Sequence, residues 1–160
     1  LTFTQVDLNE IVQQGVAAMQ PQANSERIII RTALLPSLRR VVADAASLRQ
    51  IVQNLLSNSI KFTGAGGQVI VSTAATEAGE AAIRIRDTGV GMSEQQIAAA
   101  LEPFRRLHVG APGMGGGPGI GLPLTKALTE ANRARFQIKS EIGAGTLVEI
   151  VFPATRVVGQ

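Results

Sequence analysis

The sequence predicts an α+β domain in which about three helices pack on one face of a mixed, mainly antiparallel sheet. Two observations support this prediction. Segments with helical and strand-like patterns interleave along the 160 residues, and two pairs of strand-like segments are joined by short glycine-containing turns, as in β-hairpins. Amphipathic helices need an apolar surface to bury against, and a sheet supplies one. We therefore expect residues 1–160 to form one domain, a two-layer α/β sandwich.

The first helix is expected after a short β-prone segment at residues 2–6. Asp7 can cap this helix, and Glu10 completes a capping-box pattern three residues later. Apolar residues then recur at helical spacing: Leu8, Ile11, Val12, Val16 and Met19. Pro21 and Asn24 are expected to end the helix, because proline lacks the N–H that an interior turn needs.

The second helix is expected after Asp44, as its cap, and contains the segment 51–62. At about 100° per residue, its apolar residues fall in one arc that should face the sheet: Leu48, Ile51, Val52, Leu55, Leu56 and Phe62. Asn54, Asn58 and Lys61 form a second stripe beside this arc. Amide oxygens suit a hard cation and an ammonium suits phosphate, so the stripe fits a metal-bound polyphosphate. The alternative is an ordinary core helix whose Asn and Lys side chains are simply solvated.

The other elements follow from β-branched runs, turn residues and helical spacing. Further strands are predicted at residues 27–33, 39–43, 68–74, 81–86, 135–141 and 145–152. Further helices are predicted at residues 93–101 and 120–132. The Gly/Pro-rich stretch 108–119 carries almost no packing signal, and long irregular loops of this kind are usually functional.

Composition excludes several classes of function. The net charge is only +3, aromatic residues make up 3% of the chain, and the arginines are scattered, so we expect no nucleic-acid partner. The chain has no cysteine, which excludes disulfides and thiolate metal sites and fits a reducing, cytoplasmic compartment. No apolar run approaches the roughly 20 residues of a membrane span. Because the sequence begins at Leu1, we expect it to be part of a longer protein, and any membrane anchor of that protein would lie outside these residues.

Asp87 begins the motif DTGVGM directly after a predicted strand. Gly89 and Gly91 allow the backbone to approach a flat ligand, and a carboxylate can accept a hydrogen bond from an exocyclic amine such as that of adenine. An ordinary Asp-x-Gly turn is the alternative.

Residues 115–122 (GGGPGIGL) precede a predicted helix, where exposed N–H groups and the helix dipole favour phosphate. A flexible linker is the alternative. Arg105 and Arg106 could reach phosphates from the loop or be solvated, and His108 reads as a surface residue because no nucleophile or acid is paired with it.

Together these segments resemble the ATP-binding catalytic domain of bacterial sensor histidine kinases. This domain belongs to the superfamily shared with gyrase, the ninety-kilodalton heat-shock chaperone and the mismatch-repair ATPases. The resemblance covers nearly the whole chain. The matching motifs are the N box at 54–63, the G1 box at 87–92, the F box at 102–104, the G2 box at 117–122 and the closing segment 140–153.

The resemblance implies a Bergerat fold with a flexible ATP lid at about residues 105–118, and a role for each matching residue. Asn58 would bind Mg²⁺, Asp87 would accept from the adenine amine, and Asn54, Lys61 and Arg106 would act at the phosphates as catalytic residues. The full implied nucleotide site is Asn54, Asn58, Lys61, Phe62, Asp87, Gly89, Gly91, Met92, Arg106, Gly119, Ile120, Gly121, Leu122 and Thr146.

The implied function is transfer of the γ-phosphoryl group of ATP to a histidine on a dimerisation domain outside this chain, in two-component signal transduction with a response regulator. The chain itself is expected to be monomeric and the full-length protein a homodimer. Pro118 departs from the family pattern, which usually has a small hydroxyl residue there. This departure leaves open a catalytically impaired module that senses nucleotide or binds a partner. A hydrolase is disfavoured, because such relatives place a glutamate where this chain has Asn54.

Overall fold

A computed structural model of the chain describes residues 1–102 and 121–159. Its strands are β1 (Thr4–Val6), β2 (Ile29–Ala33), β3 (Val41–Ala43), β4 (Gln68–Ala75), β5 (Ala81–Asp87), β6 (Arg135–Glu141) and β7 (Gly145–Phe152). Its helices are α1 (Leu8–Ser25), α2 (Ala45–Phe62), α3 (Glu94–Leu101), α4 (Gly121–Ala131) and the 3₁₀ turn η2 (Ala154–Arg156).

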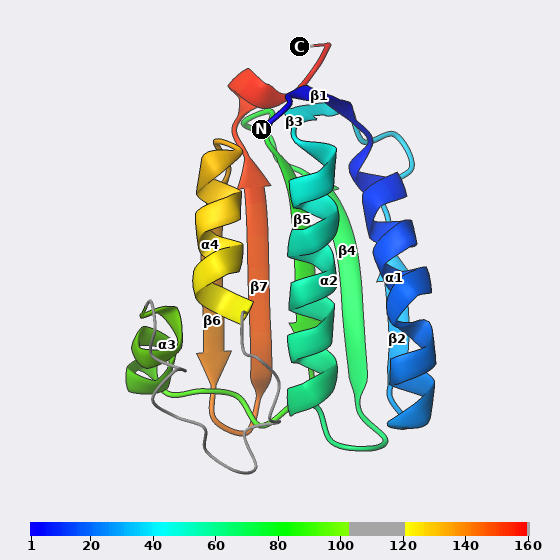
Figure 1. Ribbon diagram of the computed structural model, residues 1–160, viewed down its shortest axis with the longest axis vertical. Coiled ribbons are helices and arrows are strands. Elements are labelled where there is room, and N and C mark those ends of the chain that lie inside the picture. The colour runs from blue at the N-terminus through cyan, green and yellow to red at the C-terminus, as the bar shows by residue number, and fades with distance from the viewer. Residues whose placement is uncertain (103–120, 160) are drawn as a thin grey trace.

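Five strands form one mixed sheet in the order β2-β4-β5-β7-β6. β2 pairs with β4 in parallel, and the remaining neighbours are antiparallel. Helices α1, α2 and α4 lie side by side over one face of this sheet, and α3 stands at its β6 edge (Figure 1). The predicted two-layer α/β sandwich is therefore confirmed.

Two features of the topology were not predicted. β1 and β3 pair with each other in a separate two-stranded sheet rather than joining the main one. The parallel pairing of β2 with β4 is made possible by the crossover through α2, since parallel neighbours cannot be joined by a tight turn.

The core lies between the helices and the sheet and is almost entirely aliphatic. The inward residues of the central strands, such as Val71, Ile83 and Ile150, meet the apolar side of α2, where Leu48 and Leu56 are fully buried. The opposite face of the sheet carries charged pairs, including Arg84 Nε and a Glu149 carboxylate oxygen 2.8 Å apart. The helices thus bury one face and leave the other polar.

The prediction that Pro21 ends the first helix is wrong, because α1 continues through it to Ser25. Pro21 is exposed, so its missing N–H leaves the carbonyl of Ala17 open to water rather than to the core. The last turn is held by the fully buried Ala23, whose carbonyl accepts from the Ile28 N–H at 2.9 Å. Burial and the closing bonds at this end outweigh one lost hydrogen bond.

The prediction that Phe62 lies in the buried arc of α2 is also wrong. Its side chain is 40% exposed, whereas Ser59 and Ile60 are buried. Phe62 is the last residue of α2, beyond the part of the helix that the sheet covers, and the following Thr63 turns inward instead.

Candidate nucleotide-binding site

The elements that carry the described site residues meet toward one end of the sandwich, the lower end in Figure 1. The last turn of α2 carries Asn58, β5 ends at Asp87, α4 begins at Gly121, and β7 brings Thr146 beside Asp87 as its register partner. These four elements are far apart in sequence, and the sheet and helix packing place their ends together.

Asp87 is buried because of its place in the sheet. β5 is the central strand, and its alternate residues Ile83 and Ile85 face the helices, so Asp87 continues the inward side beneath α2. Its Oδ1 accepts from the N–H groups of Gly89 at 2.9 Å and Thr146 at 3.2 Å. The Ser59 side chain of α2 supplies a third hydrogen bond. A carboxylate has about four acceptor sites, so Asp87 can accept from one further donor.

The protonation of Asp87 is governed mainly by burial, since only 7% of the residue is exposed. Desolvation raises the pKa of Asp87 above the usual aspartate value, although the hydrogen bonds from Gly89, Thr146 and Ser59 oppose the shift. A carboxylate held in this way gains from an additional hydrogen-bond donor.

Positions 89 and 91 need glycine because other parts of the backbone lie too close to leave room for a Cβ atom. A Cβ on Gly89 would collide with the carbonyl oxygen of Phe62. Gly91 has a φ of +74°, and a Cβ there would collide with the carbonyl of Glu141. The loop after β5 is therefore wedged between the end of α2 and the β6–β7 turn, which fixes one wall of the site.

Ser140 links this loop to β7. Its hydroxyl oxygen accepts from the Met92 N–H at 2.7 Å and lies 2.8 Å from Thr146 Oγ1. It also donates to the Gly145 carbonyl at 2.9 Å. The predicted residues Met92 and Thr146 are thus connected through a serine that the sequence analysis placed only inside the closing motif.

The polar stripe of α2 faces the start of α4. A Cβ on Gly121 would lie 2.6 Å from Asn58 Nδ2, so the glycine lets α4 begin against the Asn58 amide. Asn54, one turn earlier on α2, has a buried Nδ2 with no hydrogen-bond partner among the described residues. Lys61 is partly buried near the end of the same helix, and Leu122 packs against the core from α4. The stripe is not fully solvated, contrary to the alternative reading.

The remaining predicted residues lie outside the described part of the chain. These are Arg106, Gly119, Ile120 and the lid at residues 105–118. Their predicted roles stay predictions.

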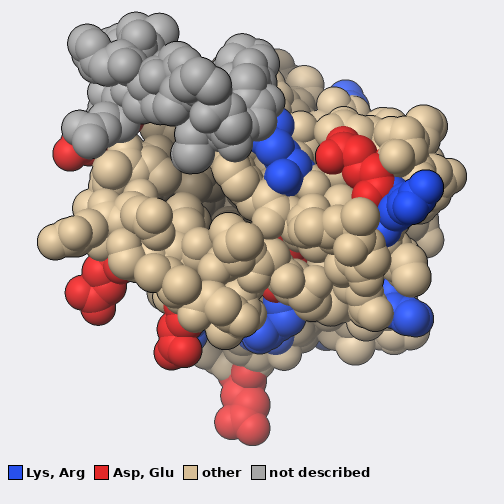
Figure 2. Space-filling view, turned by 90° about the horizontal axis from the view of Figure 1, so that it is seen from below, with Lys and Arg blue, Asp and Glu red and all other residues tan. Residues whose placement is uncertain are grey.

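Among the described residues, charged side chains of one sign do not gather into one patch at this end of the molecule. The view from below shows acidic and basic groups interspersed over the described surface, some of opposite sign next to one another (Figure 2). Residues 1–102 and 121–159 also contain no group of three or more His, Cys, Asp or Glu side chains that could hold a metal.

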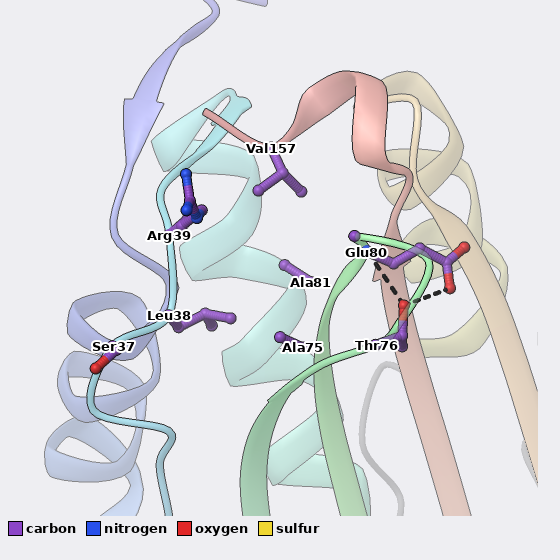
Figure 3. A pocket seen from close by; sticks show the side chains of 9 residues that line it. Ser37, Leu38, Arg39, Ala75, Thr76, Glu80, Ala81 and Val157 are labelled. Atoms are coloured by element: carbon purple, nitrogen blue, oxygen red, sulfur yellow. Dashed lines mark hydrogen bonds between the residues drawn. The ribbon is translucent and has the colours of Figure 1, made fainter. Parts of the chain in front are cut away.

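A separate cavity of about 200 Å³ lies at the other end of β5, lined by Leu38, Ala81 and Val157 among others (Figure 3). There the Thr76 hydroxyl donates to the Glu80 carboxylate at 3.2 Å. Because β5 runs from Ala81 to Asp87, this cavity is separated from Asp87 by the length of the strand, roughly 20 Å. It takes no part in the candidate site.

Comparison with known families identifies the family to which this fold belongs. The family model of the histidine kinase-, DNA gyrase B- and HSP90-like ATPases matches residues 43–156, well over half of the chain. The chain belongs to this ATPase family.

Within the family, the similarity is to histidine kinases. The chain is 48% identical over 168 aligned positions to the cell-division control histidine kinase PdhS of Brucella canis, and it spans only 16% of that protein's length. The catalytic-domain fold recurs in the mycobacterial sensor histidine kinase MprB, with a TM-score of 0.79 and 24% identity over 95% of this chain and 97% of that one. It also recurs in full-length ShkA in complex with AMPPNP, with a TM-score of 0.79 and 28% identity over 96% of this chain and 31% of that one.

Two serines that lie inside the family motifs also shape the candidate site. Ser59, which bonds to Asp87, and Ser140 were not predicted as site residues. Ser59 falls within the buried arc of α2, where a polar residue among Leu55, Leu56 and Ile60 is the signal that could have marked it.

Among the described residues, no helix is both long and apolar enough to cross a bilayer.

Proposed function

We propose that this chain binds ATP with Mg²⁺ and transfers the γ-phosphoryl group to a histidine on a dimerisation domain of the same protein, outside the 160 residues. The observation that supports this most is the buried Asp87 carboxylate, held by Gly89 and Thr146 at the same end of the fold as Asn58 and Gly121. Membership of the ATPase family and 48% identity to a named histidine kinase support it further.

Asp87 would recognise adenine through its remaining acceptor site. The exocyclic amine of adenine is a donor, whereas guanine presents a carbonyl oxygen at the corresponding ring position, which a carboxylate repels. Because three protein donors already orient the carboxylate, little reorganisation is needed when the base binds. Gly89 and Gly91 would hold the loop that forms one wall of the base pocket.

The phosphates would lie between α2 and the start of α4. Asn58 would offer its amide oxygen to the metal, Lys61 its ammonium to phosphate, and α4 its free N–H groups and positive dipole end. These donors fit Mg²⁺, which is usually bound through few protein ligands together with phosphate oxygens. When bound, the metal supplies charge neutralisation at the phosphates.

The transfer itself would need positioning more than covalent chemistry. The bond between the γ-phosphorus and the β,γ-bridging oxygen breaks, a phosphorus–nitrogen bond forms on the acceptor imidazole, and ADP leaves. Asn54 occupies the place where hydrolytic relatives carry a glutamate, and an amide cannot take a proton from water. Asn54 therefore favours transfer to an already nucleophilic imidazole over hydrolysis.

The proposed physiological setting is a two-component system. The phosphorylated histidine would pass its phosphoryl group to a response regulator, and the dimerisation domain would make the full-length protein a homodimer. A catalytically impaired sensing module is the second candidate, favoured by Pro118 alone, since proline removes an N–H donor from the phosphate loop.

Phosphotransfer in the full-length protein tests the proposal. We expect incubation with γ-labelled ATP and Mg²⁺ to label the acceptor histidine, and Asn58→Ala to remove both the labelling and the Mg²⁺ dependence of ATP binding. A full-length protein with an intact acceptor histidine that binds ATP yet is never labelled would support the impaired module instead. Mg²⁺ dependence that persists in Asn58→Ala would assign the metal to another ligand.

A further inference from the structure

Helices α2 and α4 run antiparallel and are fixed against each other at both ends. At the lower end, Gly121 begins α4 against the Asn58 amide. At the upper end, Asn132 Oδ1 accepts from the Asp44 N–H at 2.7 Å, directly before α2 begins. These two contacts set the register of the interface between them.

The α4 side of this interface carries three polar residues with no exposed surface: Thr125, Thr129 and Asn132. The Thr129 hydroxyl donates to the Thr125 carbonyl at 2.7 Å, and Asn132 Nδ2 donates to the Leu128 carbonyl at 2.8 Å. Both are thereby satisfied. The Thr125 hydroxyl is different, because it has no partner among the described residues.

The α2 side has a matching unpaired group. Asn54 Nδ2 is buried and also lacks a partner within residues 1–102 and 121–159. Asn54 lies one helical turn before Asn58, and Thr125 lies one turn after Gly121. Because the helices are antiparallel and Asn58 touches Gly121, the same register brings Asn54 opposite Thr125.

We propose that Thr125 is a positioning residue for Asn54. When ATP and Mg²⁺ bind, rotation of the Asn54 side chain brings Asn54 Nδ2 to the Thr125 hydroxyl oxygen, which accepts a hydrogen bond that neither group makes within the described part of the chain, and Asn54 Oδ1 then faces the metal. A buried polar group left unpaired is unfavourable, so pairing these two groups favours the side-chain orientation that presents the oxygen to the metal. This inference rests on the proposed ATP–Mg²⁺ site and names a residue of α4 that acts on it through α2.

The test uses the 160-residue chain and the ratio of ATP dissociation constants measured without and with Mg²⁺. Thr125→Val keeps the side-chain shape and removes the hydroxyl, and we expect it to lower this ratio about threefold to tenfold, the value of one hydrogen bond. ATP affinity without metal should be unchanged. Thr125→Ser, which restores the hydroxyl, should recover most of the ratio.

Thr129→Val is the matched control, because it removes a hydroxyl that is equally buried on the same helix but bonded within α4. It should leave the ratio unchanged, and thermal unfolding of each variant checks that the chain folds. In an Asn54→Ala background, Thr125→Val should cause no further loss of the ratio.

Three results would overturn the inference. Thr125→Val and Thr129→Val could change the ratio of dissociation constants equally, or Thr125→Val could lower that ratio in the Asn54→Ala background as much as in the wild type. The third result is that Thr125→Val weakens ATP binding without metal as much as it weakens ATP binding with metal. Failure of the wild-type chain to bind ATP at all would instead overturn the proposed function itself.

Discussion

Asp87 shows how burial and function oppose each other in a single side chain. Burial raises the pKa of this carboxyl, with three hydrogen bonds working against the shift. A raised folded-state pKa means that the folded chain holds this proton more tightly than the unfolded chain does. The stabilising contribution is therefore complete below the unfolded pKa and is lost as the pH rises through the folded pKa. At neutral pH the buried, ionised carboxylate lowers the stability of the nucleotide-free fold, and a hydrogen-bond donor on a bound nucleotide would offset part of this loss.

The first prediction concerns Asp87→Asn in the absence of nucleotide. The asparagine Oδ1 can keep both backbone hydrogen bonds without the buried charge, so we expect a higher unfolding midpoint at pH 7 than in the wild type. The difference should shrink as the pH falls through the raised pKa of Asp87.

Asp44→Asn is the control, because the pKa of Asp44 is shifted in the opposite direction to that of Asp87. The Ser47 side chain and N–H, followed by the Thr2 N–H, lower the pKa of Asp44, so its contribution is present at neutral pH and lost on acidification. Asp44→Asn should thus destabilise the chain at pH 7. Equal effects of both substitutions across the pH range would contradict the account.

The second prediction concerns Gly121. An added Cβ would lie 2.6 Å from Asn58 Nδ2, at the movable end of that side chain, so Gly121→Ala should fold while displacing the Asn58 amide. Alanine also favours a helix by about 1 kcal/mol over glycine. We expect stability to change little, and calorimetry to show the Mg²⁺-dependent part of ATP affinity falling at least about threefold.

Gly64→Ala is its matched control, since a Cβ there meets nothing within 4 Å. Unchanged metal-dependent affinity in Gly121→Ala would mean that Asn58 does not act from the position seen here.

At the scale of elements, the pairing of α2 with α4 brings the two parts of the proposed phosphate site together. The contact between Asn132 and the Asp44 N–H holds one end of this pair, and the other end is the site itself. Secondary-structure patterns located both helices, because their apolar spacing is strong. They did not reveal the polar residues between them, since Thr125, Thr129 and Asn132 lie on a face whose partner is set only by the tertiary register.

Asn132→Ala should separate this structural contact from chemistry. The substitution leaves the Asp44 N–H without its acceptor and removes the bond to the Leu128 carbonyl, so we expect a loss of about 1–3 kcal/mol in the free energy of unfolding by urea. Asn24→Ala, at an exposed position of α1, should change it by less than about 0.5 kcal/mol. Equal unfolding midpoints for the two variants would show that the contact does not hold the helices together.

At the scale of the molecule, the sequence was most informative about local pairing. The β4–β5 and β6–β7 hairpins follow from alternation and short turns, and the structure confirms them. The parallel β2–β4 pair and the separate β1–β3 sheet were not predicted, because neither is joined by a tight turn and both depend on how α1 and α2 pack. The motif order predicted the family, whereas the contacts of Ser140 and Thr125 became visible only in the assembled fold.

The site exists only in the whole domain, because its residues come from four elements that meet at one end of the sheet. Calorimetric titration of the wild-type chain and Asp87→Asn with ATP and GTP, in the presence of Mg²⁺, therefore tests the central claim most directly. A hydrogen bond to a charged group contributes on the order of 1.5–3 kcal/mol. We predict that the wild type prefers ATP, and that Asp87→Asn weakens ATP binding about tenfold or more and abolishes the preference over GTP. Unchanged affinity and unchanged preference in Asp87→Asn would contradict the assignment of Asp87 as the adenine-recognising residue.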